Sequence, residues 1–420
     1  MFPRPAAALG RLRTLSRCAL VPVALLVAGW LALPSPAVAA QRVEVFDLPS
    51  AKGNVDLRST VRLNRVSTLR ATVILPEGYD EQPGRRWPVL YMLHGVGDNT
   101  STWIDRKNGD LVNRTAGYPA IIVMPEGGRS YWVDQWLGGR RVGGNWRRYL
   151  LDEVIPTIEA RYRILPGRDH HAIGGLSMGG YGAMLAAAEL PTYFGAAISF
   201  SGLLNLESWG AENLVPPISQ MSFTRTWGRP GGPYQKASSP KALLSNLGRT
   251  RLFLTSGNGT PDPASIYDPA QLVLGSLGEL GSWSDTYTFY RSARARGIPV
   301  TYRFRQGLHT WLYWRRDVPK MLAWNPFAPA PAITPAAGGT TTFRTMSAHG
   351  NAFGLGFRFD ALPRTLIEFK RTGQTVSATG SGRVTITPGA ADADASGNGS
   401  RTDCQFTATL PFSHTLPAGC

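Results

Sequence analysis

Short apolar runs alternate along residues 70–304 with longer segments in which apolar positions recur at helical spacing. The runs are rich in β-branched and aromatic residues and are too short for helices, so they predict β-strands. The alternation is typical of an α/β fold whose mostly parallel sheet is covered by helices on both faces. The predicted helices are Trp146–Ala160, Gly182–Leu190 and Ser284–Arg296. The predicted strands are Arg70–Leu75, Pro88–Leu93, Ala120–Met124, His171–Gly174, Ala196–Ser199, Arg251–Thr255 and Val300–Phe304.

The composition changes after the main α/β domain, which we expect over residues 41–325. Residues 326–340 are rich in Pro, Ala and Gly, a composition typical of a linker. Beyond the linker, clusters of Gly, Ser and Thr separate three predicted strands, which indicates a small β-rich C-terminal module over residues 341–420. We expect this module to lengthen and stabilise the protein, and docking on a cell wall or polysaccharide is the alternative. Its predicted strands are Ala352–Phe359, Thr365–Lys370 and Arg383–Thr387.

The N-terminus has the pattern of a secretory signal peptide over residues 1–40. Four arginines precede the apolar run Cys18–Leu33, and small residues follow it, with cleavage expected near Ala39 or Ala40. The run is shorter than the ~20 residues of a bilayer span, so we expect a secreted protein without a stable membrane span. Cys404 and Cys420 would then be the only cysteines, and an oxidising compartment predicts a disulfide between them.

The chain is strongly basic, with a formal net charge of +16. The predicted signal peptide holds four arginines and no acids, so the mature chain would carry +12 (16 − 4). The basic residues are scattered and form no concentrated footprint with aromatic residues. The pattern therefore favours a protein working near an anionic cell envelope and disfavours nucleic-acid binding. It indicates no oligomeric state.

A candidate nucleophile is Ser177, in the motif Gly175-Leu176-Ser177-Met178-Gly179. The motif follows the predicted strand at His171–Gly174 and precedes a helix-forming run. A serine becomes a useful nucleophile on such a sharp strand-to-helix turn, where the helix N-terminus favours developing negative charge. This context favours a nucleophile over an ordinary glycine-rich turn.

The base that would serve Ser177 can be found by elimination. A hydrolase triad in the order serine, acid, histidine needs a histidine after Ser177 in the same domain. His309 satisfies this condition and follows a predicted strand. The remaining histidines either precede the serine or lie beyond the linker, and they are His94, His170, His171, His349 and His414.

An oxyanion hole needs two backbone N–H groups that point at the tetrahedral intermediate. One is expected from Met178, directly after the nucleophile. The second is expected from Val96, in the loop after an early strand. His94 in that loop is expected to have a structural role.

Four ordered motifs make the chain resemble the antigen 85 mycolyltransferases and their relatives in the wider esterase D family. The likeness spans most of Val43–Trp324 and is absent from the C-terminal module. It implies a secreted α/β-hydrolase that moves acyl groups between ester donors and hydroxyl acceptors, without a metal or organic cofactor. The motifs are Gly175–Met178, Ser201-Gly202-Leu203-Leu204-Asn205, Gly257-Asn258-Gly259-Thr260-Pro261 and His309-Thr310-Trp311-Leu312-Tyr313-Trp314.

The resemblance leaves two candidates for the triad acid. In the antigen 85 pattern a glutamate stands a fixed distance before a helical phenylalanine and a glycine, and Glu279, Phe289 and Gly297 reproduce that spacing. In simpler esterases of the family the acid lies in a Gly-Thr-x-Asp turn, which would be Asp262 here. We favour Glu279, and either carboxylate could orient the imidazole and stabilise its charged form.

The chain departs from the antigen 85 pattern in the oxyanion loop. Residues 94–97 read His-Gly-Val-Gly, where those proteins have an Asp-Gly-Leu-Arg stretch that helps to hold trehalose. Trehalose is therefore not the expected acceptor. The sequence predicts a serine acyltransferase or esterase acting on small-molecule or envelope esters. A plain carboxylesterase acting on polysaccharide or lipid esters is the alternative. A non-catalytic binding protein is disfavoured because serine, acid and histidine are all present in order.

Overall fold

The computed structural model describes residues 41–50, 52–55, 66, 68–136, 144–265, 267–333, 339–389 and 404–417. The predicted signal peptide, part of the linker (residues 334–338) and Cys420 lie outside these residues. Cys404 is buried, and its disulfide with Cys420 stays a prediction.

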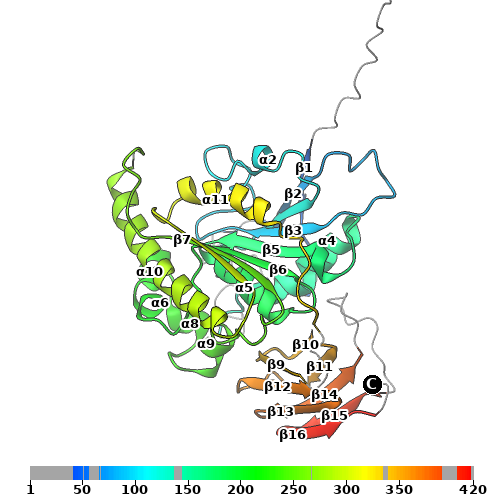
Figure 1. Ribbon diagram of the computed structural model, residues 1–420. Helices are drawn as coiled ribbons and strands as arrows, with labels where there is room; N and C mark the ends of the chain where they lie inside the picture. Colours follow the sequence, from blue (N-terminus) through cyan, green and yellow to red (C-terminus); the bar gives the residue numbers. More distant parts are fainter. Residues whose placement is uncertain are drawn as a thin grey trace, which may run out of the picture. The chain divides into compact units, whose positions relative to one another are not determined.

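An eight-stranded sheet forms the centre of the main domain, in the order β1-β2-β4-β3-β5-β6-β7-β8 (Figure 1). Strands β4, β3, β5, β6, β7 and β8 pair in parallel, and β1 and β2 add an antiparallel edge. The seven predicted strands all form, each within two residues of its predicted ends, so the predicted α/β architecture is confirmed. The strands are β1 Arg42–Asp47, β2 Arg70–Leu75, β3 Val89–Leu93, β4 Ile121–Pro125, β5 His171–Leu176, β6 Ala196–Phe200, β7 Arg251–Gly257 and β8 Val300–Arg305.

Helices cover both faces of this sheet. The predicted helix at Trp146–Ala160 forms as three consecutive segments, α3 (Trp146–Tyr149), a π-helical turn (Leu150–Val154) and α4 (Ile155–Arg161). The predicted start of α10 at Ser284 is wrong, because the helix begins at Pro269. The remaining helices are α2 Leu111–Arg114, α5 Met178–Glu189, α6 Trp209–Asn213, α7 Val215–Ser219, α8 Phe223–Trp227, α9 Pro233–Ala237, α10 Pro269–Arg294 and α11 Trp311–Trp324.

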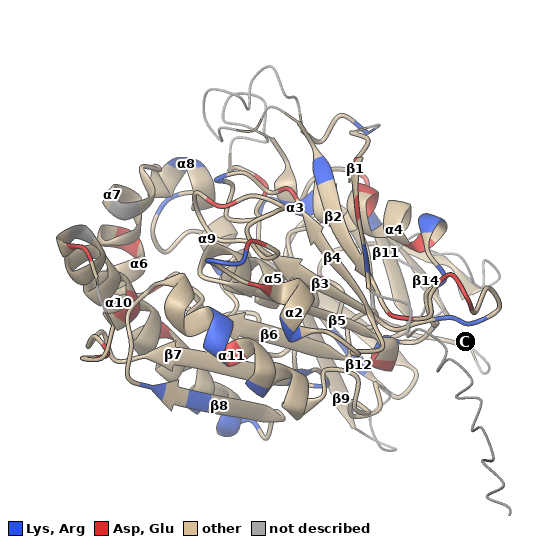
Figure 2. Ribbon diagram, turned by 90° about the horizontal axis from the view of Figure 1, so that it is seen from above, with Lys and Arg blue, Asp and Glu red and all other residues tan. Residues whose placement is uncertain are grey.

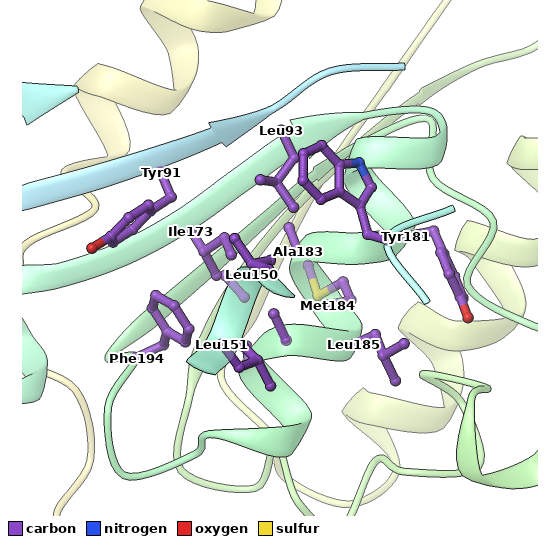
Figure 3. Close-up of a cluster of buried hydrophobic side chains, with 14 of the residues drawn as sticks. Tyr91, Leu93, Leu150, Leu151, Ile173, Tyr181, Ala183, Met184, Leu185 and Phe194 are labelled. Carbon is purple, nitrogen blue, oxygen red and sulfur yellow. The ribbon is translucent and has the colours of Figure 1, made fainter. Parts of the chain in front are cut away.

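Two apolar clusters pack on opposite faces of the sheet because successive strand side chains point to opposite sides. In β3, Tyr91 and Leu93 pack with α5 on one face, whereas Leu90 and Met92 pack with α11 on the other. Figure 3 shows the first cluster, in which strand side chains meet Ala183, Met184 and Leu185 of α5. This packing fixes α5 against the strand that precedes it.

The C-terminal module forms two antiparallel four-stranded sheets around a phenylalanine-rich core. The predicted β-rich character is confirmed, and the exact domain boundaries stay a prediction. One sheet joins β10 (His349–Ala352), β11 (Leu355–Phe359), β14 (Arg383–Pro388) and β15 (Phe406–Thr409). The other joins β16 (Phe412–Thr415), β13 (Thr375–Thr379), β12 (Ile367–Thr372) and β9 (Thr340–Thr345).

In the part of the chain that the structure describes, no helix is both long and apolar enough to span a membrane.

Candidate active site

Ser177 occupies the tight turn between β5 and α5. Its backbone has φ 51° and ψ −118°, a conformation that costs a non-glycine residue about 1–3 kcal/mol. The serine N–H donates to the Phe200 carbonyl at 2.8 Å and helps to hold the turn. A Cβ on Gly179 would lie 2.2 Å from the Leu93 carbonyl oxygen, so only glycine fits there. The glycines of the motif therefore allow α5 to approach β3 and expose the serine hydroxyl at the carboxyl end of the sheet.

His309 reaches Ser177 from the loop between β8 and α11. Its Nε2 lies 2.8 Å from Ser177 Oγ. The loop rests on α10, where the His309 N–H donates to the Gly275 carbonyl at 3.0 Å. A Cβ on Gly278 would lie 3.4 Å from the imidazole Cγ, so the glycines of α10 leave room for the histidine. The rings of His309 and Trp314 are also nearly perpendicular, with centroids 4.8 Å apart.

Glu279 lies in the middle of α10 and is fully buried. Its Oε2 is 2.8 Å from His309 Nδ1, on the opposite side of the ring from the serine. Its Oε1 accepts hydrogen bonds from the Ser201 hydroxyl at 2.8 Å and from the Gly257 N–H. Arg305 adds a positive charge 3.5 Å from the same oxygen. These hydrogen bonds engage both carboxylate oxygens and fix the orientation of the Glu279 side chain.

Asp262, the alternative acid, lies in a different environment. Its carboxylate pairs with Arg316 at 3.1 Å and accepts from the Ala264 N–H at 3.0 Å. The Ala264 N–H, followed by Arg316, lowers the pKa of Asp262. The structure thus brings Glu279, and not Asp262, against His309.

Several groups that surround the acid have contacts that the sequence alone does not predict. Ser201 bonds Glu279 and accepts from the Trp314 indole N–H at 3.1 Å, and the Gly257 N–H bonds the same carboxylate. All three residues belong to the motifs that carried the family resemblance. The motifs therefore marked these residues in the sequence, but only the folded structure shows that they contact Glu279.

The two expected oxyanion donors both line the cavity beside Ser177. Met178 is the first residue of α5, where backbone N–H groups have no partner in the preceding turn. The loop that holds Val96 passes close to the serine, since a Cβ on Gly95 would lie 3.6 Å from Ser177 Cβ. The Gly95 N–H is already bonded to Asp98 at 3.2 Å. Val96 stays the predicted second donor.

Side chains beneath the oxyanion loop hold it in place. His94 is buried, with Nδ1 2.8 Å from the Gly95 carbonyl and Nε2 3.0 Å from the Gly127 N–H, contacts suited to the expected structural role. The Trp311 indole N–H donates to Asp98 at 3.2 Å and ties the loop to α11. Burial raises the pKa of Asp98.

A cavity of about 590 Å³ opens above the serine. Its size is in the range of small-molecule binding sites. Leu274 and Leu277 of α10 and Leu214, beside α7, give it an apolar wall, and Asp285 adds a carboxyl group. Lys107 and Arg315 also line it. The cavity thus combines apolar surface for an acyl chain with polar groups for an ester or a hydroxyl.

Comparison with known proteins gives matches over the main domain. The putative esterase family matches residues 64–325. "Esterase Rv1288" of Mycobacterium tuberculosis is 33% identical over 212 residues, covering 47% of this chain and 44% of that protein. "Diacylglycerol acyltransferase/mycolyltransferase Ag85C" of Mycobacterium leprae is 27% identical over 219 residues, covering 48% of this chain and 62% of that protein. The chain thus spans about half the length of the curated relatives it matches.

Solved structures support the same fold. The crystal structure of Mycobacterium tuberculosis MPT51 covers 69% of this chain and 99% of its own, with a TM-score of 0.51 and 21% identity. The serine hydrolase FphF of Staphylococcus aureus covers 69% of this chain and all of its own, with a TM-score of 0.52 and 16% identity. The resemblance to antigen 85 proteins is therefore confirmed, and the sequence identity to these proteins is modest.

Proposed function

The chain belongs to the putative esterase family, and on that premise we propose that it is a secreted serine acyltransferase or esterase that carries an acyl group on Ser177. The observation that carries the proposal is the pair of 2.8 Å contacts that link Ser177, His309 and Glu279 at the base of the cavity. A serine, an imidazole and a buried carboxylate in this order form the general arrangement for activating a hydroxyl.

In the first half of the reaction, His309 Nε2 accepts the proton of Ser177 Oγ while the oxygen attacks the ester carbonyl. The N–H groups of Met178 and Val96 stabilise the oxyanion of the tetrahedral intermediate. The intermediate collapses when the bond to the leaving alcohol breaks and His309 returns its proton to that alcohol. An acyl group is then esterified to Ser177.

In the second half, an acceptor hydroxyl or water enters and gives its proton to His309 as its oxygen attacks the acyl-enzyme. Collapse of the second intermediate releases the product ester or acid and reprotonates Ser177. Glu279 accepts the Nδ1–H of His309 throughout, which keeps Nε2 free to take the serine proton and stabilises the imidazolium.

The acceptor decides whether the enzyme transfers or hydrolyses. Both relatives named above match the catalytic domain, one named an esterase and the other an acyltransferase. The His-Gly-Val-Gly sequence at residues 94–97 disfavours trehalose. Burst kinetics with a chromogenic ester, with and without added sugars, separate the two outcomes. If no sugar accelerates turnover or becomes acylated, transfer to those sugars is wrong.

A fluorophosphonate probe tests the proposal itself, because it reacts covalently with activated serines. We expect stoichiometric labelling of the purified protein, loss of esterase activity on labelling, and no labelling of the Ser177→Ala variant. A folded wild-type protein that resists the probe would instead support a non-catalytic binding protein.

Secretion is the second part of the proposal and rests on the pattern of residues 1–40. Expression in an actinobacterial host with its native leader should release a protein that begins near residue 40 or 41. Mass spectrometry of protein from the culture medium measures this. Recovery of only the full-length chain from the cells would contradict it.

A further inference from the structure

The outer side of α10 is apolar although it faces solvent. Before Arg291, the only acidic or basic residues of this helix are Glu279 and Asp285, and both are buried. We define the α10 apolar face by its exposed large side chains, which are Leu272, Val273, Leu274, Leu277, Leu280 and Tyr287.

The exposure of these residues is large. Val273 is 60% exposed, Leu274 53% and Leu280 44%. The neighbouring helix α6 adds Trp209, which is 71% exposed. The two helices pack closely, since a Cβ on Gly210 would lie 4.0 Å from Gly281 Cα. Soluble monomers seldom expose such a set of side chains without a binding function.

The α10 apolar face is continuous with the cavity that holds Ser177. Leu274 and Leu277 are exposed to solvent and also line the cavity. A molecule whose apolar part rests on α10 therefore has a direct route to the serine. This continuity favours an occupant that itself carries the ester.

Cations line the same cavity. Lys107 and Arg315 contribute to its wall, and the Arg315 guanidinium donates to the Lys107 carbonyl at 3.1 Å. Figure 2 shows further basic residues on α11. Lys107 is exposed and Arg315 partly exposed, and apolar side chains beside such cations match a surface in which anionic headgroups cover acyl chains.

We propose that the α10 apolar face docks on an anionic lipid surface, from which the cavity takes its ester substrate. The substrate part of this inference rests on the proposed function, whereas docking does not require catalysis. Insertion of Leu272, Val273 and Leu280 among the acyl chains removes their apolar area from water. Lys107 and Arg315 meet the headgroups.

Co-sedimentation with vesicles tests the docking. We expect the Ser177→Ala protein to bind phosphatidylcholine vesicles that contain about one-third phosphatidylglycerol. Binding to these vesicles should weaken at high salt, and binding to vesicles of pure phosphatidylcholine should be weaker still. The double variant Leu272→Ser/Val273→Ser should lower the partition coefficient at least about tenfold, because it removes two large apolar side chains from contact with the acyl chains. Neither residue lines the cavity, so the same double variant made with Ser177 intact should hydrolyse a short soluble ester at the wild-type rate.

A matched control is available elsewhere on the surface. Val45 on β1 is 57% exposed and Leu362 is 53% exposed. The Val45→Ser/Leu362→Ser variant should bind vesicles like the parent. Equal binding by both double variants, or no binding to anionic vesicles at all, would overturn the proposal. So would light scattering that shows a dimer dissociated by Leu272→Ser/Val273→Ser, because a second copy would then cover the face. Failure of soluble-ester hydrolysis would instead count against the proposed function.

Discussion

Replacing Glu279 by glutamine should abolish most of the activity, although the two side chains have the same size and shape. The Ser201 hydroxyl and the Gly257 N–H both donate to Oε1. In the variant, these donors would hold the amide oxygen at the Oε1 position. The amide NH₂ would therefore occupy the position of Oε2, 2.8 Å from His309 Nδ1 in the native site. An NH₂ group can only donate there.

That geometry forces the wrong tautomer on the histidine. His309 Nδ1 becomes the acceptor, so Nε2 carries the proton and cannot take one from Ser177. The imidazolium also loses its counter-ion. The equivalent substitution in a well-studied serine protease lowers kcat about 10⁴-fold, so we expect a loss of about 10³ to 10⁴-fold, or about 4–5 kcal/mol of transition-state stabilisation.

Steady-state hydrolysis of a p-nitrophenyl ester measures this effect in wild type, Glu279→Gln and Asp262→Asn. Asp262 pairs with Arg316 and does not contact His309, so Asp262→Asn should keep kcat within about twofold. Circular dichroism and thermal unfolding establish that each variant is folded. A Glu279→Gln enzyme with near-native kcat, or an Asp262→Asn enzyme with the larger loss, would refute the reasoning.

Three further predictions concern residues around the site. Burial raises the pKa of Asp285 to about 7. The carboxyl group therefore binds a proton more tightly in the folded protein than in the unfolded chain. The free energy of unfolding should fall by up to about 4 kcal/mol as pH rises from about 4 to 7. Asp285→Asn should flatten that dependence and be more stable than wild type at pH 8, as urea unfolding at pH 5 and 8 measures; a parallel dependence in both proteins would contradict it. Ser201→Ala removes one hydrogen bond to the Glu279 carboxylate and should lower kcat about tenfold with KM unchanged. Steady-state ester hydrolysis measures both constants, and a change in KM alone would place Ser201 in substrate binding instead. Gly179→Ala puts a Cβ 2.2 Å from the Leu93 carbonyl oxygen and should lower the melting temperature by several degrees or prevent folding. A stable and active Gly179→Ala protein would instead show that α5 can shift away from β3.

The sequence predicted the sheet well because its strands are buried on both faces. β3, β4, β5 and β6 have buried positions throughout, which produces continuous apolar runs. β1 was missed because it lies at the sheet edge, where four of its six positions are exposed and none is fully buried. The first half of α10 was missed because its glycines have low helix propensity and its exposed face is apolar, so helical periodicity is weak.

Ser177 and His309 could be located from local patterns and chain order, whereas the preference for Glu279 over Asp262 came only from the spacing of the family resemblance. Glu279 is in the middle of a long helix, and Asp262 is in a loop after β7. Which of them meets the imidazole depends on how the His309 loop rests on Gly275 and Gly278. That contact joins segments about 30 residues apart and is set by packing, which no local propensity encodes.

The central claim is an acyl group on Ser177, and the mass of the trapped intermediate tests it most directly. A p-nitrophenyl ester has an activated leaving group, so deacylation should limit turnover and the acyl-enzyme should accumulate. The reaction is quenched in acid within the burst phase, and peptide masses are compared for wild type and Ser177→Ala. The account predicts a mass increase equal to the acyl group on the peptide that contains Ser177, and none in the variant. Release of p-nitrophenol with the acyl group on another residue, or with no adduct, would contradict it.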